Sequence, residues 1–172
     1  MRASSTISAN DNGFTLIEMM VVVVIAAIMM GAVTLSFPSN QADELLKKEG
    51  DRFVALMHFA QDEATLQSRE FALSLDKTGY AFYLNDQGSW VAAEGPFARN
   101  DFPEVIKPAL YVEGESIALS KKKNISPQIL ILSTGEVTPF SYRLSYLNEI
   151  NLDINVDAGG LIKQRIEKKD AK

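Results

Sequence analysis

The sequence has no cysteine and only one histidine among its 172 residues. Without cysteine, the chain can form no disulfide and offers no thiolate to a metal ion. The single histidine, His58, has no acid or nucleophile motif beside it, so we interpret it as a surface or partly packed side chain. Nucleophile-elbow, phosphate-loop and zinc motifs are also missing. We therefore expect no enzymatic activity, no catalytic or metal-ligating residue and no cofactor.

Basic residues are scarce in most of the chain. The formal net charge is −5, and residues 14–162 alone carry 11 basic and 19 acidic side chains. Binding to phosphate backbones needs clustered positive charge. This acidic balance makes nucleic acid an unlikely partner. Hydrophobic residues form 47% of the sequence, which is typical of a folded chain.

One long apolar run begins near the N-terminus. From Phe14 to Phe37 it holds 24 residues with a single charge, Glu18. About 20 apolar residues can cross the hydrocarbon core of a bilayer as a helix. The run is too long for the 7–15-residue core of a cleaved secretory signal, and an A-x-A-like cleavage site is missing. A plain membrane anchor would leave Glu18 unexplained, because a charge deep in a membrane helix costs about 2.5–3.5 kcal/mol.

The residues at the start of this run decide between these interpretations. Gly13-Phe14-Thr15-Leu16-Ile17-Glu18, followed by an apolar helix, resembles the prepilin signature of type IV pilins and type II secretion pseudopilins. The resemblance implies that a prepilin peptidase/methyltransferase cuts between Gly13 and Phe14 and N-methylates Phe14. Glu18 would then be the fifth mature residue, available to pair with the amino terminus of a neighbouring subunit during assembly. The leader departs from the family pattern, since its only basic residue is Arg2, offset by Asp11.

The signature divides the chain into parts. We expect a cleaved leader (residues 1–13), a transmembrane helix (14–37), a periplasmic continuation of that helix (38–69) and a β-rich periplasmic domain (70–172). Pro38 ends the apolar run and predicts a bend at the membrane exit. The continuation has an apolar stripe at a spacing of three to four residues, and Gly50 interrupts it as a weak point of the helix. The stripe comprises Leu46, Gly50, Phe53, Met57, Ala60, Ala64, Gln67 and Phe71.

Short alternating runs after residue 69 predict strands joined by turns. We expect strands at 71–75, 80–84, 89–91, 109–112, 115–120, 128–133, 137–147, 150–157 and 161–166. Residues 94–108, with three prolines, predict a loop, and Gly159-Gly160 predicts a late hairpin turn. The fold class is therefore α+β, a long N-terminal helix followed by a mostly antiparallel β-sheet or sandwich, arranged as a meander.

Two further segments carry a second resemblance. AQDEATLQSR (residues 60–69) and ILILSTGEVTPFSYRL (residues 129–144) are similar to the helix end and a strand–turn–strand of GspH-type minor pseudopilins. Gly135 would allow a tight turn, Glu136 would face solvent, and Pro139 would start or edge a strand. Minor pilins of type IV pili share this domain. The absence of cysteine favours the secretion system, since pilus subunits of this group often carry a disulfide.

The resemblance implies a function and partners. We expect a minor pseudopilin at or near the tip of the type II secretion pseudopilus, supporting protein export across the outer membrane. The alternative is a minor pilin of a type IV pilus, acting in adhesion or DNA uptake. Expected partners are other pseudopilin subunits, the peptidase/methyltransferase, an inner-membrane assembly platform and membrane lipid. The chain would cross the inner membrane once, with its C-terminal domain in the periplasm.

Three charged segments remain. Alternating polar residues at 151–157 lack the glycine and the final acid of a calcium loop, so a half-buried strand explains them better. Lys121-Lys122-Lys123 predicts a solvated loop. The basic residues of 163–172 indicate either a frayed charged end or a contact with a polyanion or an acidic neighbouring subunit.

Overall fold

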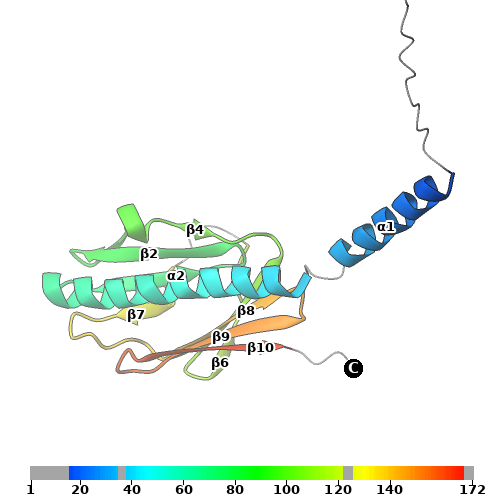
Figure 1. Cartoon of the computed structure of the whole chain (residues 1–172). Coiled ribbons are helices and arrows are strands. Elements are labelled where there is room, and N and C mark those ends of the chain that lie inside the picture. Colours follow the sequence, from blue (N-terminus) through cyan, green and yellow to red (C-terminus); the bar gives the residue numbers. More distant parts are fainter. Residues whose placement is uncertain (1–15, 35–37, 122–125, 169–172) are drawn as a thin grey trace, which may run out of the picture. The chain divides into compact units, whose positions relative to one another are not determined.

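The computed structural model describes residues 16–34, 38–121 and 126–168 (Figure 1). The chain divides into two compact units, Met1–Pro38 and Ser39–Lys172. Among the described residues, the first contains helix α1, and the second contains helix α2, a short 3₁₀ helix and all the strands. Each unit is described by itself below.

Helix α1 runs from Leu16 to Thr34 and is apolar throughout apart from Glu18 in its first turn. The side chains of residues 16–27 are exposed within this chain. In the part of the chain that the structure describes, no helix combines the length and hydropathy needed to cross a membrane. Residues 35–37, which connect α1 to the next helix, lie outside the described ranges. The prediction of one continuous helix through residues 14–69 therefore depends on residues that the structure does not describe.

Helix α2 begins at Pro38 and ends at Gln67. Proline suits a first helical position, because the N–H group it lacks would have had no partner inside the helix. The predicted stripe is confirmed from Leu46 to Ala64, where every member is buried, whereas Gln67 is exposed. Ser68 ends the helix with a φ of 51°, and the Arg69 amide donates to the Ala64 carbonyl at 3.0 Å. That left-handed residue and its bond are a common way to close a helix.

Gly50 was predicted to be a weak point of the helix; α2 continues through it without a break, and the glycine has a packing role that was not predicted. The glycine is buried, and it faces strands β9 (Ile150–Val156) and β10 (Ile162–Lys168). A Cβ atom placed there would lie 2.2 Å from Leu152 Cδ2 and 3.3 Å from Gln164 Oε1. Gly50 therefore lets the helix backbone pack closely on the sheet; the predicted stripe placed it on the packing face but could not identify Leu152 and Gln164 as its neighbours.

The first sheet, sheet A, has the order β3-β2-β1-β7, with β4 also paired to β2. All of its pairs are antiparallel. Its strands are β1 (Phe71–Leu75), β2 (Gly79–Asp86), β3 (Ser89–Ala92), β4 (Asn100–Asp101) and β7 (Ile129–Ile131). Strand β1 is buried along its whole length. It forms the centre of this sheet.

The second sheet, sheet B, has the order β10-β9-β8-β5-β6 and is also antiparallel. Its strands are β5 (Ile106–Val112), β6 (Glu115–Ile117), β8 (Phe140–Tyr146), β9 (Ile150–Val156) and β10 (Ile162–Lys168). The Gly159-Gly160 turn joins β9 to β10 as predicted. Gly160, with a φ of 79°, donates its amide to the Asp157 carbonyl at 2.9 Å.

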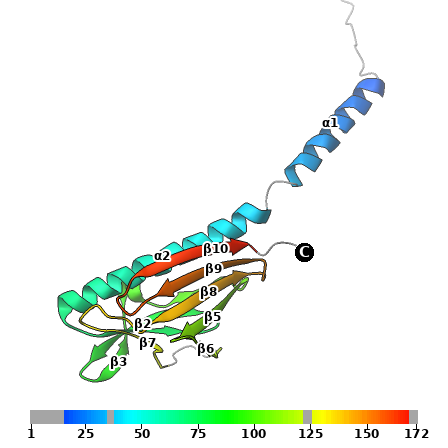
Figure 2. The same cartoon turned by 90° about the horizontal axis from the view of Figure 1, so that it is seen from below.

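The core lies between α2 and the two sheets, and Figure 2 shows the helix running along the strands of sheet B. Phe53 of α2 sits at its centre. Its ring lies 5.1 Å from that of Tyr80 in sheet A and 5.0 Å from that of Tyr142 in sheet B. Burial raises the pKa of Tyr80 to about 12, so this phenol stays neutral and packs as an aromatic core residue. Phe53 of α2 therefore packs against both sheets.

The α+β prediction is confirmed, but the simple meander is wrong. After β6 the chain returns to sheet A as β7 and then crosses again to place β8 beside β5. Residues 94–108 are also more ordered than predicted. They contain the short 3₁₀ helix η1 (Gly95–Phe97), strand β4 and the start of β5. Pro108 is tolerated within β5 because β6 pairs only with Leu110–Val112, which leaves Pro108 on an open edge.

Candidate functional site: assembly elements and the outer sheet

The residues predicted to act in processing and assembly fall at the edge of what the structure describes. Gly13 and Phe14 lie outside the described residues. Glu18 lies in the first turn of α1, and its side chain is exposed within this chain. A carboxylate suits that position, because the N-terminal end of a helix carries partial positive charge.

The second family-like segment, residues 129–144, has the predicted form. Gly135 has a φ of 87° and donates its amide to the Leu132 carbonyl at 2.9 Å, which makes the tight turn. Glu136 faces solvent, and Pro139 directly precedes β8. The turn lies close to the end of α2, since a Cβ atom on Gly135 would be 3.6 Å from Thr65 Oγ1.

The other family-like segment, residues 60–69, is the C-terminal end of α2. Gln61 Nε2 donates to the Gly160 carbonyl at 3.1 Å, so this helix end also contacts the β9–β10 turn. A Cβ atom on Gly160 would lie 1.8 Å from Gln61 Nε2. The Gln61 side chain would have to move, and any other residue would also be strained by the φ of 79° at this position. The two segments that resemble the family therefore meet at one end of the domain.

The alternating polar residues at 151–157 form a cross-strand ladder. Ser141 Oγ donates to Asn155 Oδ1 at 2.7 Å, and Ser145 Oγ donates to Asn151 Oδ1 at 2.7 Å. Between them, Arg143 binds Asp153 through two hydrogen bonds of 2.5 and 3.0 Å. The predicted half-buried strand is confirmed, because the alternate residues of β9 are buried. The ladder accounts for the polar pattern without a cation.

The basic C-terminal segment is not a frayed end as far as Lys168. Residues 162–168 form β10, which pairs with β9 along its whole length. The strand is also fastened to α2. Lys168 Nζ lies 2.6 Å from Asp43 Oδ2, and Gln164 Nε2 donates to Asp51 Oδ1 at 2.7 Å. Residues 169–172 lie outside the described ranges.

Lys121 and His58 are both at the surface of the described chain. Lys121 is exposed, as predicted for a solvated loop, while residues 122–125 are not described. His58 is exposed on α2. Among the residues that the structure describes, no cluster of three or more His, Cys, Asp or Glu side chains could hold a metal ion.

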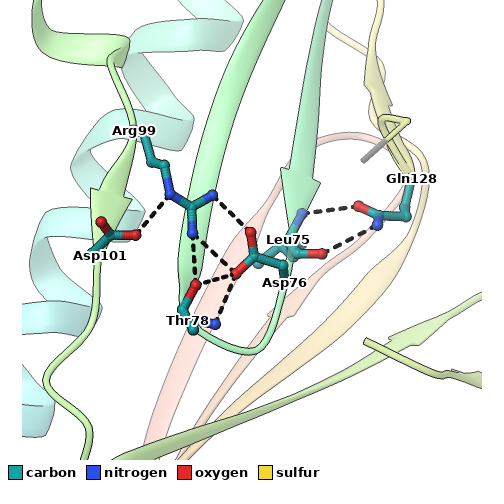
Figure 3. A network of polar contacts seen from close by, with 6 residues as sticks. All are labelled: Leu75, Asp76, Thr78, Arg99, Asp101 and Gln128. Atoms are coloured by element: carbon teal, nitrogen blue, oxygen red, sulfur yellow. Dashed lines mark hydrogen bonds and ion pairs between the residues drawn. The ribbon is translucent and has the colours of Figure 1, made fainter. Parts of the chain in front are cut away.

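A buried ion pair was missed by the sequence analysis. The carboxylate of Asp76 accepts bonds of 2.7 and 3.0 Å from the Arg99 guanidinium (Figure 3). Thr78 donates its amide and its hydroxyl to the same carboxylate, each at 2.7 Å. Burial by itself would raise the pKa of Asp76, but the bonds from Arg99 and Thr78 outweigh burial and lower it. The network fixes the β1–β2 turn against the segment that leads into β4.

A second polar link connects distant segments of sheet A. The side chain of Gln128 bridges the backbone of Leu75, accepting from its N–H at 2.9 Å and donating to its carbonyl at 3.1 Å (Figure 3). Neither Gln128 nor Arg99 stands in a recognisable motif. The only sequence signal was the turn expected between the strands at 71–75 and 80–84, which contains Asp76 but gave no indication of Arg99 as its partner.

The comparisons with known proteins agree with the architecture. Residues 8–34 match the prokaryotic N-terminal methylation motif, and residues 49–160 match the type II transport protein GspH family. The type II secretion system protein H of Pseudomonas aeruginosa is 32% identical over 169 residues, covering 91% of this chain and 96% of that protein.

Two solved structures share the fold. The minor pseudopilin EpsH from the type 2 secretion system of Vibrio cholerae matches with a TM-score of 0.60 at 17% identity, over 74% of this chain and 99% of that one. The solution structure of Escherichia coli GspH matches with a TM-score of 0.56 at 19% identity, over 80% of this chain and 99% of that one.

An N-terminal helix that lies within a methylation motif, followed by antiparallel sheets, defines the pilin-like class of proteins. Within that class, the chain belongs to the GspH family of type II transport proteins, the minor pseudopilins of type II secretion. Membership also makes it a structural, non-enzymatic protein, as the sequence predicted. The family implies assembly with other pseudopilins and processing by a prepilin peptidase. Its methylation motif is consistent with anchoring in the inner membrane.

Proposed function

We propose that this minor pseudopilin is made as a precursor and is cut between Gly13 and Phe14, with N-methylation of Phe14. The observation that carries the proposal is the methylation-motif match over residues 8–34, which spans both residues and Glu18. The reacting groups would belong to the prepilin peptidase/methyltransferase. This chain would supply the glycine, the new amino terminus and the apolar helix by which it is held.

The processed chain would be anchored once in the inner membrane with its C-terminal domain in the periplasm. The support is the apolar run of residues 14–37, which extends beyond α1 at both ends and has 24 residues with one charge. At 1.5 Å per residue, a helix of that length would be roughly 36 Å long, enough for the hydrocarbon core. Residues 38–69 would continue the chain into the periplasm as a helix, and residues 70–172 would supply the β-rich part.

In the assembled pseudopilus, the chain would stand at or near the tip and support protein export across the outer membrane. Its partners would be other pseudopilin subunits, the inner-membrane assembly platform and membrane lipid. Nucleic acid is unfavourable as a partner, since residues 14–162 have eight more acidic than basic side chains. The family match favours this role over that of a type IV pilus subunit.

The test is the mass of the mature protein. The chain should be extracted from the membrane of cells that contain the peptidase, and its N-terminal peptide analysed by mass spectrometry. We expect the peptide to start at N-methyl-Phe14. Gly13→Ala should leave the precursor uncut or slowly cut, whereas Ser8→Ala in the same leader should be processed normally. An assembled subunit that retains Met1 would refute the proposal.

A further inference from the structure

Strand β3 forms one border of sheet A and has an open edge. In the described chain it pairs with β2 on one side and with no strand on the other (Figure 2). The Ala93 amide donates to the Phe82 carbonyl of β2 at 2.9 Å. Hydrogen-bonded positions alternate along an antiparallel strand, so every second residue before Ala93 also bonds toward β2. The backbone N–H and C=O groups of Trp90 and Ala92 therefore point away from β2, into the open edge.

The other sheet edges in the described ranges are protected against a further strand. Proteins usually protect edge strands with charges, proline or a covering segment, because their unpaired backbone groups can bind another chain. Strand β10 is bound to α2 through Gln164 and Lys168. In β7, the Leu130 amide donates to the Thr138 hydroxyl, and the Leu130 carbonyl accepts from the Thr138 amide. Pro108 interrupts the open part of β5, while β4 and β6 have two or three residues, one of them acidic in each.

Strand β3 has none of these protections. Its four residues include no charge and no proline. Ser89, Val91 and Ala92 are exposed, and Trp90 is half-buried. Val91 is paired with Leu84, which packs against the core, while Trp90 and Ala92 lie on the opposite face of the sheet. A strand added to this edge would therefore meet apolar side chains on both of its faces.

The small size of the edge indicates what kind of partner it can hold. Four residues of a strand extend over only about 13 Å, whereas a stable complex usually buries about 800 Å² on each partner. The edge of β3 is therefore too small to hold a freely diffusing protein by itself. It suits a partner that is already kept beside the chain, because tethering raises the effective concentration. A neighbouring pseudopilin, anchored in the same membrane, meets this condition.

The contact demands little of that neighbour. Every residue except proline carries one backbone donor and one backbone acceptor, so no particular charge is needed on the partner. Pairing of β3 with β3 of a second copy is less suitable. It would close a two-fold dimer, whereas growth of a filament needs a heterologous contact.

We infer that the open edge of β3 pairs with an extended segment of an adjacent pseudopilin subunit, which adds a strand to sheet A. The inference rests on the proposed function, because the shared membrane and filament keep the two subunits close together. The amides of Trp90 and Ala92 donate to carbonyl groups of the added strand, and their carbonyl groups accept from its amides.

The experiment uses the full chain in cells that also make the other pseudopilins. A photo-crosslinking amino acid replaces Ser89, and the crosslinked products are identified by mass spectrometry. We expect a crosslink to another pseudopilin. Ala92→Pro removes one outward amide and places the proline ring in the edge, so it should lower the yield about fivefold or more. Ala92→Ser keeps the amide and should leave the yield unchanged.

A melting measurement and a second variant separate loss of pairing from loss of folding. Proline is tolerated in an edge strand where its nitrogen faces solvent, so the Ala92→Pro chain in detergent should melt within roughly 5 °C of the wild type. Val91→Lys leaves all backbone groups in place and adds the kind of charge that protects edge strands. It should lower the crosslink yield as well. Unchanged yields in both variants would overturn the inference.

Other outcomes separate the inference from the proposed function. A processed chain that crosslinks to pseudopilins from positions in α1, but not from Ser89, would overturn the inference and leave the proposed function standing. Crosslinks from Ser89 only to a second copy of this chain, or only to an exported protein, would also overturn it. A chain that is neither processed nor crosslinked to any pseudopilin would overturn the proposed function.

Discussion

At the scale of single residues, Asp76 contributes to stability through a charge that is almost fully buried. It is 1% exposed, while its partner Arg99 has a side chain that is 21% exposed. Removing one member of a buried ion pair leaves the other without compensation, which costs about 3–5 kcal/mol when both are fully buried. Because Arg99 reaches solvent, we expect a cost near the lower end of that range.

Asp76→Asn should therefore lower the free energy of unfolding by about 3 kcal/mol. The folded-state pKa of Asp76 lies below its ordinary value of 3.8, so its contribution is present above about pH 5 and is lost as pH falls through the folded-state pKa. Thermal melts of the full chain in detergent, between pH 7 and pH 3, should show a weaker pH dependence for Asp76→Asn than for the wild type. Asp101→Asn, at a half-exposed carboxylate on the same arginine, should change stability by less than about 1 kcal/mol. Equal effects of the two changes would contradict the role given to burial.

We expect the charge of Glu18 to matter as well, with an effect that appears in assembly. If its carboxylate pairs with a neighbouring amino terminus in low dielectric, removing it leaves that amino group unpaired at a cost of roughly 3–5 kcal/mol. Membrane insertion should be unchanged or improved, because a charge in a membrane helix is costly. We expect Glu18→Gln and Glu18→Ala to reach normal membrane levels and normal processing with weakened crosslinks to partner subunits. Full crosslinking and full secretion in both variants would exclude this pairing.

At the scale of elements, strand positions could be predicted and strand partners could not. Residues 71–75 were predicted and found as β1, and most other strands lie within two or three residues of their predicted bounds. Alternation and turn residues are local signals. The pairing of β1 with β7 and of β5 with β8 depends on segments far apart in the chain. The same limit hid the Asp76–Arg99 pair and the contact of Gly50 with Leu152, whereas the processing motif is local and could be recognised at once.

Strand β10 is expected to stabilise the fold. It covers the edge of β9 and is fastened to α2 by the Lys168–Asp43 ion pair and the Gln164–Asp51 hydrogen bond. A chain that ends after Leu161 should melt at least about 10 °C lower than the full chain, which corresponds to a loss of roughly 3 kcal/mol. A chain that ends after Lys168 keeps the strand and should melt close to the full chain. Equal melting of the two shortened chains, followed by circular dichroism, would show that β10 does not stabilise the fold.

At the scale of the whole molecule, the division of the chain near residue 38 predicts that its two parts can be separated. The second unit, Ser39–Lys172, contains the complete core between α2 and both sheets. A chain lacking residues 1–39 should be soluble without detergent and β-rich by circular dichroism, because it retains every strand and loses the apolar run. The matched comparison is a chain lacking residues 1–13, which keeps that run and should need detergent. Recovery of the shorter chain only in detergent would contradict the boundary.

The contact of Gly50 with β9 and β10 also has a consequence for the order in which the protein is made. Leu152 and Gln164 follow the glycine by more than 100 positions in the chain. The site on α2 that receives them therefore stays uncovered until almost all of the chain has left the ribosome and reached its compartment. Contacts between such distant segments form late and slow the folding of a domain. The domain can therefore complete its folding only after the C-terminal strands β9 and β10 have been synthesised and transported. Formation of helix α2 alone is not sufficient.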